Sequence, residues 1–516
     1  MTAELSAAKS ALPASGQLDL SPTGQTPLRH AGLGLRWRRV AIALVSAATA
    51  SGCLPVGHVP PFVVPPPTSP PELLVISEAP AWLEQLHVVL GDVPSLMVPA
   101  HGTHGEATVG LLDRWVTDPW VFGHVGTRRA IVQMPGEQGL AAWGAATFTP
   151  ARGWLSFAPV DAHSNIATRC DSGGNLLVSP PIGAAHPQGC LVVGSCMQKA
   201  LKHFFADQRV QACAGSDLLE LDTSWLRVGH LDEVIGFTGG LGRVVLADPL
   251  SGWRLLGSVP PERVLFYVRG SREFTGTVTA AGGHFLEDSA VSLPKGAWAN
   301  VRIIAGTGRG QVASVTQVSP HRLAVERVWD LRPSPSLAVA RCQANRCDAM
   351  PIWFEVPDAT SRYVLVEGSQ MWIDGAGDPF PAIVTAGELL SDPELSAAAL
   401  AVAKKLLGRD GIEGAVERAF PTLGWIQPAA LFAAAADGRQ AWAFVPSPAN
   451  LIAAGSRALV LRPFGPRLRP PDDESDVFAA SWKAAFAAAA VDLTMADAWM
   501  IHRGGGGARC AVNIVR

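Results

Sequence analysis

Short apolar segments alternate with helical segments through most of the chain. From Glu72 onward, the runs Leu73 to Ile76 and Ala130 to Gln133 have the length and apolar character of strands, whereas Met197 to Asp207 has a helical pattern. This alternation predicts a mixed α/β fold.

Two helices are predicted in the last third of the chain. Asp392 can cap the first, Pro393 takes its first helical position, and Gly408 ends it after the Ala- and Leu-rich run Leu395 to Leu407. The second lies near Val477 to Ala490.

The pattern changes between about residues 270 and 369, where Thr, Val and Gly alternate and helix signals are almost absent, as in Thr275 to Thr279. We therefore predict an inserted all-β module over 270–369, which divides the α/β body into 73–269 and 370–516. The Gly-rich stretch Gly306 to Gln311 lacks the spacing of a dinucleotide fingerprint and precedes a strand pattern, where a helix would be needed to hold the pyrophosphate. We expect a structural or adhesive role for the module.

Residues 1–53 have the features of a leader with a lipoprotein-type signal peptide. Arg36 to Arg39 form a basic cluster ahead of the apolar run Val40 to Ala50, which at 11 residues is too short to span a membrane. The sequence Ala50-Ser51-Gly52-Cys53 then resembles the bacterial lipobox, in which the Cys accepts a lipid. An ordinary signal peptide or a chance apolar run would also fit this pattern.

Residues 54–72 are predicted to form an extended tether, because eight prolines lie between Pro55 and Pro71. Together with Cys53, the tether predicts an exported lipoprotein that is held on a bacterial cell envelope by its lipid anchor only.

Composition and charge narrow the range of partners. The 516 residues are 48% hydrophobic and 16% charged, which excludes disorder over most of the length. Lys plus Arg total 41 and Asp plus Glu total 44, a formal net charge of −3. Without a polycationic surface, nucleic acid is not expected as a partner.

Six cysteines are available for disulfides if Cys53 accepts lipid and Cys510 serves chemistry. Export would allow three bridges, whose connectivity the sequence does not fix. We predict only the local pair Cys342–Cys347 and expect reduced, buried thiols at the other four, which are Cys170, Cys190, Cys196 and Cys213.

Three distant segments supply the residue types needed to hydrolyse a guanidinium group: Asp113 to Asp118, Ser224 to Glu233 and Cys510 to Asn513. Residues two apart on a strand share a face, so a strand over the second segment would direct Val228, His230 and Asp232 into one pocket. A guanidinium is always charged near neutral pH and presents its donors in a fixed fork, for which two carboxylates are a natural clamp. A Cys thiolate is a suitable nucleophile for its central carbon.

With these motifs the sequence resembles the catalytic domain of the peptidylarginine deiminases, in the guanidino-group-modifying (pentein) superfamily. Further matching stretches occur in the family's order and cover about 110 to 270 and 390 to 516: Gly174-Asn175-Leu176, Val178-Ser179-Pro180-Pro181, Gly189 to Gly194, Ala443-Phe444-Val445-Pro446 with Asn450-Leu451, and Pro463-Phe464-Gly465-Pro466.

The resemblance implies a five-fold α/β propeller and assigns roles to individual residues. Asp118 and Asp232 would bind the substrate guanidinium, and Trp115 and Val228 would line its aliphatic stem. Cys510 would attack the guanidinium carbon, His230 would act as acid and base, and Asn513 would lie nearby in the substrate site. The product would be citrulline, formed with release of ammonia through a Cys thiouronium intermediate.

Two registers compete at the C-terminal motif, where the family has Val-His-Cys-x-x-Asn. Placing Cys510 and Asn513 on it puts Arg509 at the His, whereas matching Met500-Ile501-His502 would put Arg503 at the nucleophile. We prefer the first register, and we expect Gly504 to Gly507 to form a mobile lip.

The sequence departs from the animal enzymes at their calcium ligands and at the arginines that hold the substrate backbone. Gly136 and Gln138 stand where those arginines are expected. Few hard oxygen ligands occur at the positions that correspond to the calcium site, which are Thr117, Pro119, Val121, Gln133, Met134 and Leu177. We therefore predict no metal and no other cofactor.

These observations predict a deiminase of arginine in proteins or peptides. Two alternatives remain open, namely an enzyme of the same fold that acts on free arginine or another small guanidine, and a non-catalytic envelope protein that binds ligands in the same pocket.

Overall fold

The computed structural model describes most of the chain from residue 60 onward. The described residues are 60–77, 82–98, 102–104, 107–109, 115–135, 140–157, 170–208, 210–213, 216–240, 242–263, 273–329, 355–367, 372–373, 379–380, 385–391, 393–434, 440–463, 476–496, 498, 501–502 and 506–516. The predictions for Cys53, the tether up to residue 59, the Asp392 cap, the Cys342–Cys347 pair and Gly504 lie outside them.

Five small sheets in the described part of the chain share one strand pattern. In each, the central strand pairs antiparallel with one neighbour and parallel with the other. With the central strand second, they are β6 (Trp120–Val125), β7 (Arg128–Gln133) and β8 (Leu155–Phe157); β9 (Leu176–Val178), β10 (Leu191–Gly194) and β11 (Leu219–Leu221); β12 (Ile235–Phe237), β13 (Arg243–Leu246) and β23 (Gly424–Ile426); β26 (Ile452–Ala454), β27 (Arg457–Leu461) and β28 (Asp492–Ala496); and β29 (Val512–Val515), β2 (Leu73–Ser77) and β3 (Ser95–Val98).

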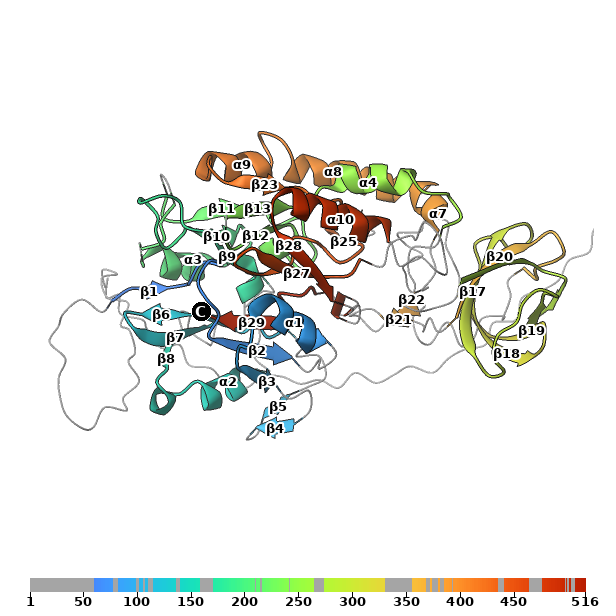
Figure 1. Cartoon of the computed structure of the whole chain (residues 1–516), viewed down its shortest axis with the longest axis horizontal. Helices are drawn as coiled ribbons and strands as arrows, with labels where there is room; N and C mark the ends of the chain where they lie inside the picture. The colour runs from blue at the N-terminus through green and yellow to red at the C-terminus, as the bar shows by residue number, and fades with distance from the viewer. Residues whose placement is uncertain are drawn as a thin grey trace, which may run out of the picture. The chain divides into compact units, whose positions relative to one another are not determined.

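Helices form the connections to the parallel strands, because parallel neighbours require a crossover. Among the described residues, four crossovers contain one α-helix each: α1 (Leu83–Leu90), α2 (Ala141–Thr147), α3 (Lys199–Ala206) and α10 (Val477–Ala488). The fifth, from β13 to β23, holds α4 (Pro249–Gly257), α7 (Ala386–Ser391), α8 (Pro393–Leu406) and α9 (Ile412–Ala419). The predicted mixed α/β class is therefore confirmed, and both predicted C-terminal helices are present. Figure 1 shows the C-terminal strand β29 beside β2 near the start of the described chain.

The predicted β texture of the inserted region is also observed. A seven-stranded antiparallel sheet lies between α4 and α7 with the order β14-β20-β17-β18-β19-β16-β15, and its strands curl into one body in Figure 1. The strands are β14 (Glu273–Thr277), β15 (Ala280–Gly282), β16 (Phe285–Glu287), β17 (Trp298–Ala305), β18 (Val312–Ser319), β19 (Arg322–Trp329) and β20 (Arg362–Glu367). The sheet has a core of its own, which includes Val301, Val315 and Leu365.

Smaller elements complete the described chain. They are β1 (Phe62–Val63) at the edge of β6, the pairs β4 (Gly102–His104) with β5 (Ala107–Val109), β21 (Trp372–Ile373) with β22 (Pro379–Phe380) and β24 (Phe432–Ala434) with β25 (Ala441–Ala443), and the 3-10 turns η2 (Pro150–Arg152), η3 (Gly173–Asn175) and η4 (Leu231–Glu233). None of the helices in the described ranges has both the length and the apolar character needed to cross a bilayer.

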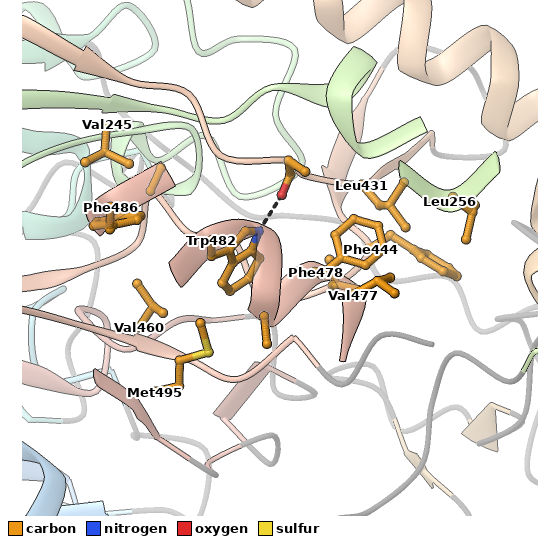
Figure 2. Packing of buried hydrophobic residues seen from close by; sticks show 14 of the residues in the cluster. Val245, Leu256, Leu431, Phe444, Val460, Val477, Phe478, Trp482, Phe486 and Met495 are labelled. Atoms are coloured by element: carbon orange, nitrogen blue, oxygen red, sulfur yellow. Dashed lines mark hydrogen bonds between the residues drawn. The ribbon is translucent and has the colours of Figure 1, made fainter. Parts of the chain in front are cut away.

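The largest apolar cluster packs around α10, as Figure 2 shows. Asp476 caps this helix by accepting hydrogen bonds from the amides of Phe478 and Ala479 at 2.8 and 3.0 Å. Trp482 is fully buried, and its indole nitrogen donates to the carbonyl of Ala429 at 2.6 Å, so the one polar atom of the ring is satisfied within the core.

The expectation of four reduced thiols is wrong. Two disulfides join these cysteines, Cys170–Cys196 and Cys190–Cys213, and Cys510 is the free cysteine of the described residues. The sequence could not reveal the pairing because the partners come from separate loops that meet only when β9, β10 and β11 form their sheet.

Candidate active site

The candidate catalytic residues occupy equivalent places in the five small sheets. In each sheet one strand pairs antiparallel with the central one, and a loop that carries candidate residues leads into that strand. Asp118 precedes β6, η3 precedes β9, His230 and Asp232 precede β12, Asn450 precedes β26, and Cys510 precedes β29. The repeated topology therefore places residues from distant parts of the sequence at corresponding positions.

Main-chain hydrogen bonds join these loops to one another. The amide of Gly173 donates to the carbonyl of Asp118 at 3.1 Å, and the amide of Thr117 donates to the carbonyl of Cys510 at 3.3 Å. The side-chain amide of Asn513 donates to the carbonyls of Val116 and Trp120, at 3.2 and 2.8 Å. These contacts hold the loop that carries Asp118 against the C-terminal strand.

His230 and Asp232 do not lie on a strand, contrary to the prediction. His230 caps the 3-10 turn η4, which contains Asp232, and the carboxylate of Glu233 accepts a hydrogen bond from the amide of His230 at 3.3 Å. Gly229 has a φ of 87°, which ends any extended run just before the turn. Val228 is half-buried on the far side of this glycine, so a two-residue strand period does not relate it to His230 and Asp232.

The four predicted catalytic side chains lie close together. Nδ1 of His230 is 3.8 Å from Oδ1 of Asp118, and Sγ of Cys510 is 4.0 Å from Oδ2 of Asp232. Gly174 permits this approach, because a Cβ there would lie 2.6 Å from Nδ1 of His230 and 3.2 Å from Oδ1 of Asp118.

Two polar neighbours that we did not predict as site residues contact the predicted acid/base and the predicted nucleophile. Oγ of Ser172 is 2.6 Å from Nε2 of His230, and Nδ2 of Asn450 is 3.3 Å from Sγ of Cys510. Asn450 lies in a stretch that matched the family, so a signal for it was present. Ser172 directly precedes the Gly-rich η3 turn, and only its contact with His230 reveals a role.

The two carboxylates are buried without enough partners. Asp118 is 6% exposed and Asp232 is fully buried, and Oδ1 of each lacks a hydrogen-bond partner among the described residues. Burial raises the pKa of Asp118 to about 6 against the opposing effect of His230. Burial also raises the pKa of Asp232, with Arg509 as the main opposing charge. Unpaired buried carboxylate oxygens are costly, and a cation with several N–H donors would satisfy them.

Cys510 is held as a neutral thiol near neutral pH. Burial raises its pKa well above 9, and the negative charges of Asp232 and Asp118 raise it further. A cation placed between the carboxylates would counter all three effects.

Two further predictions and the competing register can be placed. Trp115 is half-buried, and its ring lies so close to Gly506 that a Cβ there would come within 2.3 Å of it. In the competing register, Nε2 of His502 lies 3.2 Å from the carbonyl of Phe444, and burial lowers the pKa of this His to about 4. Cys510 occupies the place beside Asp232, while Arg503 lies outside the described residues.

The residues at the positions of the animal calcium ligands do not fit a calcium ion. The Thr117 hydroxyl donates to the carbonyls of Arg509 and Val512. Val121, Met134 and Leu177 are buried apolar side chains. Thr117, Val121 and Leu177 line a cavity of about 130 Å³ whose described lining contains two guanidinium groups and no carboxylate side chain.

Such a lining repels a cation, whereas calcium takes about six to eight oxygen ligands, usually including carboxylates. Nor do the described His, Cys, Asp and Glu side chains form a group of three that could hold a metal ion.

Residues 112–283 match the sequence model of the family described as Protein-arginine deiminase (PAD). This match supports a catalytic domain of the protein-arginine deiminase type in this segment. It contains Asp118, His230 and Asp232 and runs through α4 into the first strands of the insert. The pentein superfamily is consistent with this assignment.

Curated deiminases match part of the chain. Human protein-arginine deiminase type-1 is 28% identical over 219 residues, which cover 39% of this chain and 31% of the relative. The human type-4 enzyme is 30% identical over 164 residues, covering 28% of this chain and 24% of the relative. Mouse "Inactive protein-arginine deiminase type-6" is 34% identical over 103 residues, covering 18% and 14%. The chain thus spans less than a third of each deiminase, and one of them is described as inactive.

The disulfide next to η3 yields a prediction about the site. Cys170–Cys196 packs under Gly229, where a Cβ would lie 2.7 and 3.0 Å from the two sulfurs, and it anchors the loop of Ser172 near His230. Replacing both cysteines by Ser should destabilise the protein by about 2–5 kcal/mol. We also expect reduced turnover per folded molecule, because Ser172 loses its fixed position. Thermal denaturation and citrulline assays would measure the two effects.

Cys190–Cys213 provides the matched control. It is of similar loop length, with a separation of 23 residues against 26, and its sulfurs lie 3.7 and 3.3 Å from the carbonyl oxygen of Leu191 in β10. Its removal should cost stability with little change in turnover at temperatures where the protein stays folded. Equal losses of turnover in both double variants would contradict a specific role for Cys170–Cys196.

Proposed function

We propose that this protein hydrolyses arginine side chains in proteins or peptides to citrulline with release of ammonia. The observation that carries the proposal is the pair of buried carboxylates, Asp118 and Asp232, beside Cys510 and His230; Oδ1 of each has no hydrogen-bond partner in the described part of the chain. A guanidinium between them would supply the missing charge and donors, with its central carbon next to the sulfur. We further propose that the five sheets close into the five-fold α/β propeller of the pentein superfamily.

The proposed reaction has two halves. The bound cation lowers the pKa of Cys510, and the thiol proton passes to His230. The sulfur then bonds to the guanidinium carbon, and His230 returns a proton to the departing nitrogen, which leaves as ammonia and gives a thiouronium. His230 next takes a proton from water, whose oxygen adds to the same carbon. The C–S bond breaks, the sulfur recovers a proton, and the ureido product leaves.

A citrulline assay on two substrates tests the proposal. We expect turnover of a peptide with both ends blocked and one internal arginine. Turnover of free arginine alone would favour an enzyme for small guanidines, and failure with both would favour a non-catalytic binding protein. Ammonia should appear in equal amount to citrulline.

We expect this activity to be independent of calcium, because four of the six residues at the corresponding ligand positions are apolar and the Thr117 hydroxyl is bonded to the main chain. The protein would be dialysed against a chelator and assayed while calcium is restored. Rates that stay within about twofold would agree with residues that do not suit a calcium ion. A rise of more than about tenfold would show that carbonyl groups still build a working site.

The predicted lipid anchor on a bacterial cell envelope forms part of the proposal, since it would confine the enzyme to exported or surface substrates. A metabolic lipid label should appear on the intact protein and be lost in Cys53→Ser, where no thiol accepts the lipid. Labelling of both proteins to the same extent would remove Cys53 as the attachment site.

A further inference from the structure

The side chain of Arg509 reaches into the candidate site from the residue before the nucleophile. Its Nη1 lies 3.3 Å from Oδ2 of Asp232, and its Nη2 donates to the carbonyl of Leu176 at 2.9 Å. The Asp232 side chain is completely buried, whereas that of Arg509 is 26% exposed. A partly solvated cation therefore contacts a fully desolvated anion.

The main chain of Arg509 is fixed by two other loops of the site. Its amide donates to Oδ1 of Asn450 at 2.7 Å, and its carbonyl accepts a hydrogen bond from the Thr117 hydroxyl. These loops precede β26 and β6. They fix the main chain of Arg509, and the carbonyl of Leu176 holds its guanidinium. This differs from a surface ion pair, in which both side chains are free to move.

Arg509 is the permanent cation among the described groups that face Asp232. It also opposes the effect of burial on this carboxyl more strongly than any other neighbour does. The other charged or titratable neighbours are His230 and Glu233 on the turn of Asp232, Cys510 beside Arg509, and Asp118, while Asn450 contributes a neutral hydrogen bond.

We propose that Arg509 is a positioning residue: its guanidinium binds Oδ2 of Asp232 and keeps this carboxylate charged, so that Oδ1 stays available to the guanidinium of a substrate. The first part stands on the contacts within the protein, and the part about substrate rests on the proposed function. Without Arg509, Asp232 would be a buried acid with no fixed countercharge, and protonation would remove half the charge of the clamp.

The first test does not depend on activity. The midpoint of thermal unfolding would be measured from pH 4 to pH 8 for the wild type, Arg509→Gln, Asp232→Asn and the double variant. Loss of Arg509 raises the folded-state pKa of Asp232 further above its unfolded value of about 3.9. The destabilisation by Arg509→Gln should therefore be small near pH 4 and grow as the pH rises. In the Asp232→Asn background the same replacement should have an effect that does not vary with pH.

Two further variants make this test specific to the charge. Arg509→Lys should recover most of the wild-type stability at high pH, because it keeps a cation near Oδ2. Arg322→Gln, which breaks an exposed pair with Glu287 at 3.1 Å, should show no comparable pH dependence. Two outcomes would overturn the inference. One is that Arg509→Gln has the same pH dependence in the wild-type and Asp232→Asn backgrounds. The other is that Arg509→Lys has the same pH dependence as Arg509→Gln.

The second test addresses substrate. Calorimetry would compare binding of the blocked arginine peptide to Cys510→Ala and to Cys510→Ala/Arg509→Gln, since the Ala removes both turnover and the titration of the thiol. We expect about tenfold or greater weakening near pH 6, shrinking as the pH rises and Asp232 ionises. Equal affinities at every pH would overturn the role toward substrate. If Cys510→Ala itself fails to bind the peptide, the proposed function is wrong, and the unfolding series still decides the Arg509–Asp232 interaction.

Discussion

Asp118→Asn should reduce citrulline formation by at least about 100- to 1,000-fold while leaving the fold intact. The replacement keeps the size of the side chain but removes one of the two charges that would hold the substrate guanidinium. It also replaces an acceptor oxygen by an NH2 group, whose N–H donors would face the N–H donors of the substrate guanidinium. Oδ1 of Asp118 has no hydrogen-bond partner among the described residues, and Nδ1 of His230 lies 3.8 Å from it. Steady-state kinetics on the blocked arginine peptide would measure the loss, and circular dichroism would verify the fold.

Asp222→Asn is the matched control, because it removes a carboxylate from another ion pair of the same domain. Asp222 binds Lys405 at 2.9 Å, and both side chains are about half exposed. Its replacement should leave the rate near that of the wild type. Wild-type turnover by Asp118→Asn would exclude Asp118 from the clamp, whatever the outcome for Asp232.

The pH dependence of kcat/KM tests the role of Asp118 independently of its replacement. Asp118 must be ionised to bind a cation, and burial raises its pKa to about 6. The value of kcat/KM should therefore fall as the pH drops through this region, instead of near the ordinary pKa of an aspartate. An enzyme that keeps full kcat/KM at pH 5 would contradict an essential, buried Asp118.

Local signals in the sequence were sufficient for the helices and for the texture of the sheets. Pro393 and Gly408 marked the bounds of α8, and the alternation of Thr, Val and Gly marked the insert. The pairing of strands could not be predicted in this way. Arg243 pairs with Gly424 across the whole insert, and Leu73 pairs with Val515 across nearly the whole chain. Nothing in a strand of three to five residues specifies so distant a neighbour.

The candidate site was predictable for the residues whose own side chains suit the proposed chemistry. Asp118, His230, Asp232 and Cys510 were named from the sequence, and the structure brings them together. Their neighbours were harder to find, since Ser172 and Asn450 matter only through contacts that the fold creates. The predicted strand through Val228, His230 and Asp232 was wrong, because Gly229 lies within this segment and its positive φ leads into a 3-10 turn.

Cys510→Ala should abolish citrulline formation, with a loss of at least about 1,000-fold, yet still bind the blocked arginine peptide. The side chain is small and buried, so Ala fits the space, while the clamp of Asp118 and Asp232 is unchanged. Turnover by Cys510→Ala would exclude the proposed covalent route. Loss of peptide binding by a variant that circular dichroism shows to be folded would contradict the proposed function.

The unreacted thiol provides the most direct test of how this nucleophile is activated. Because burial and two nearby carboxylates raise its pKa well above 9, alkylation of Cys510 by iodoacetamide should be slow at pH 7. Its rate should rise about tenfold for each pH unit up to pH 9, since only the thiolate reacts and its fraction grows in that proportion. Mass spectrometry of the peptide that contains Cys510 would follow the reaction. A rate that levels off near pH 7 would show a thiolate already present before substrate binds, and the substrate cation would then not be needed to create it.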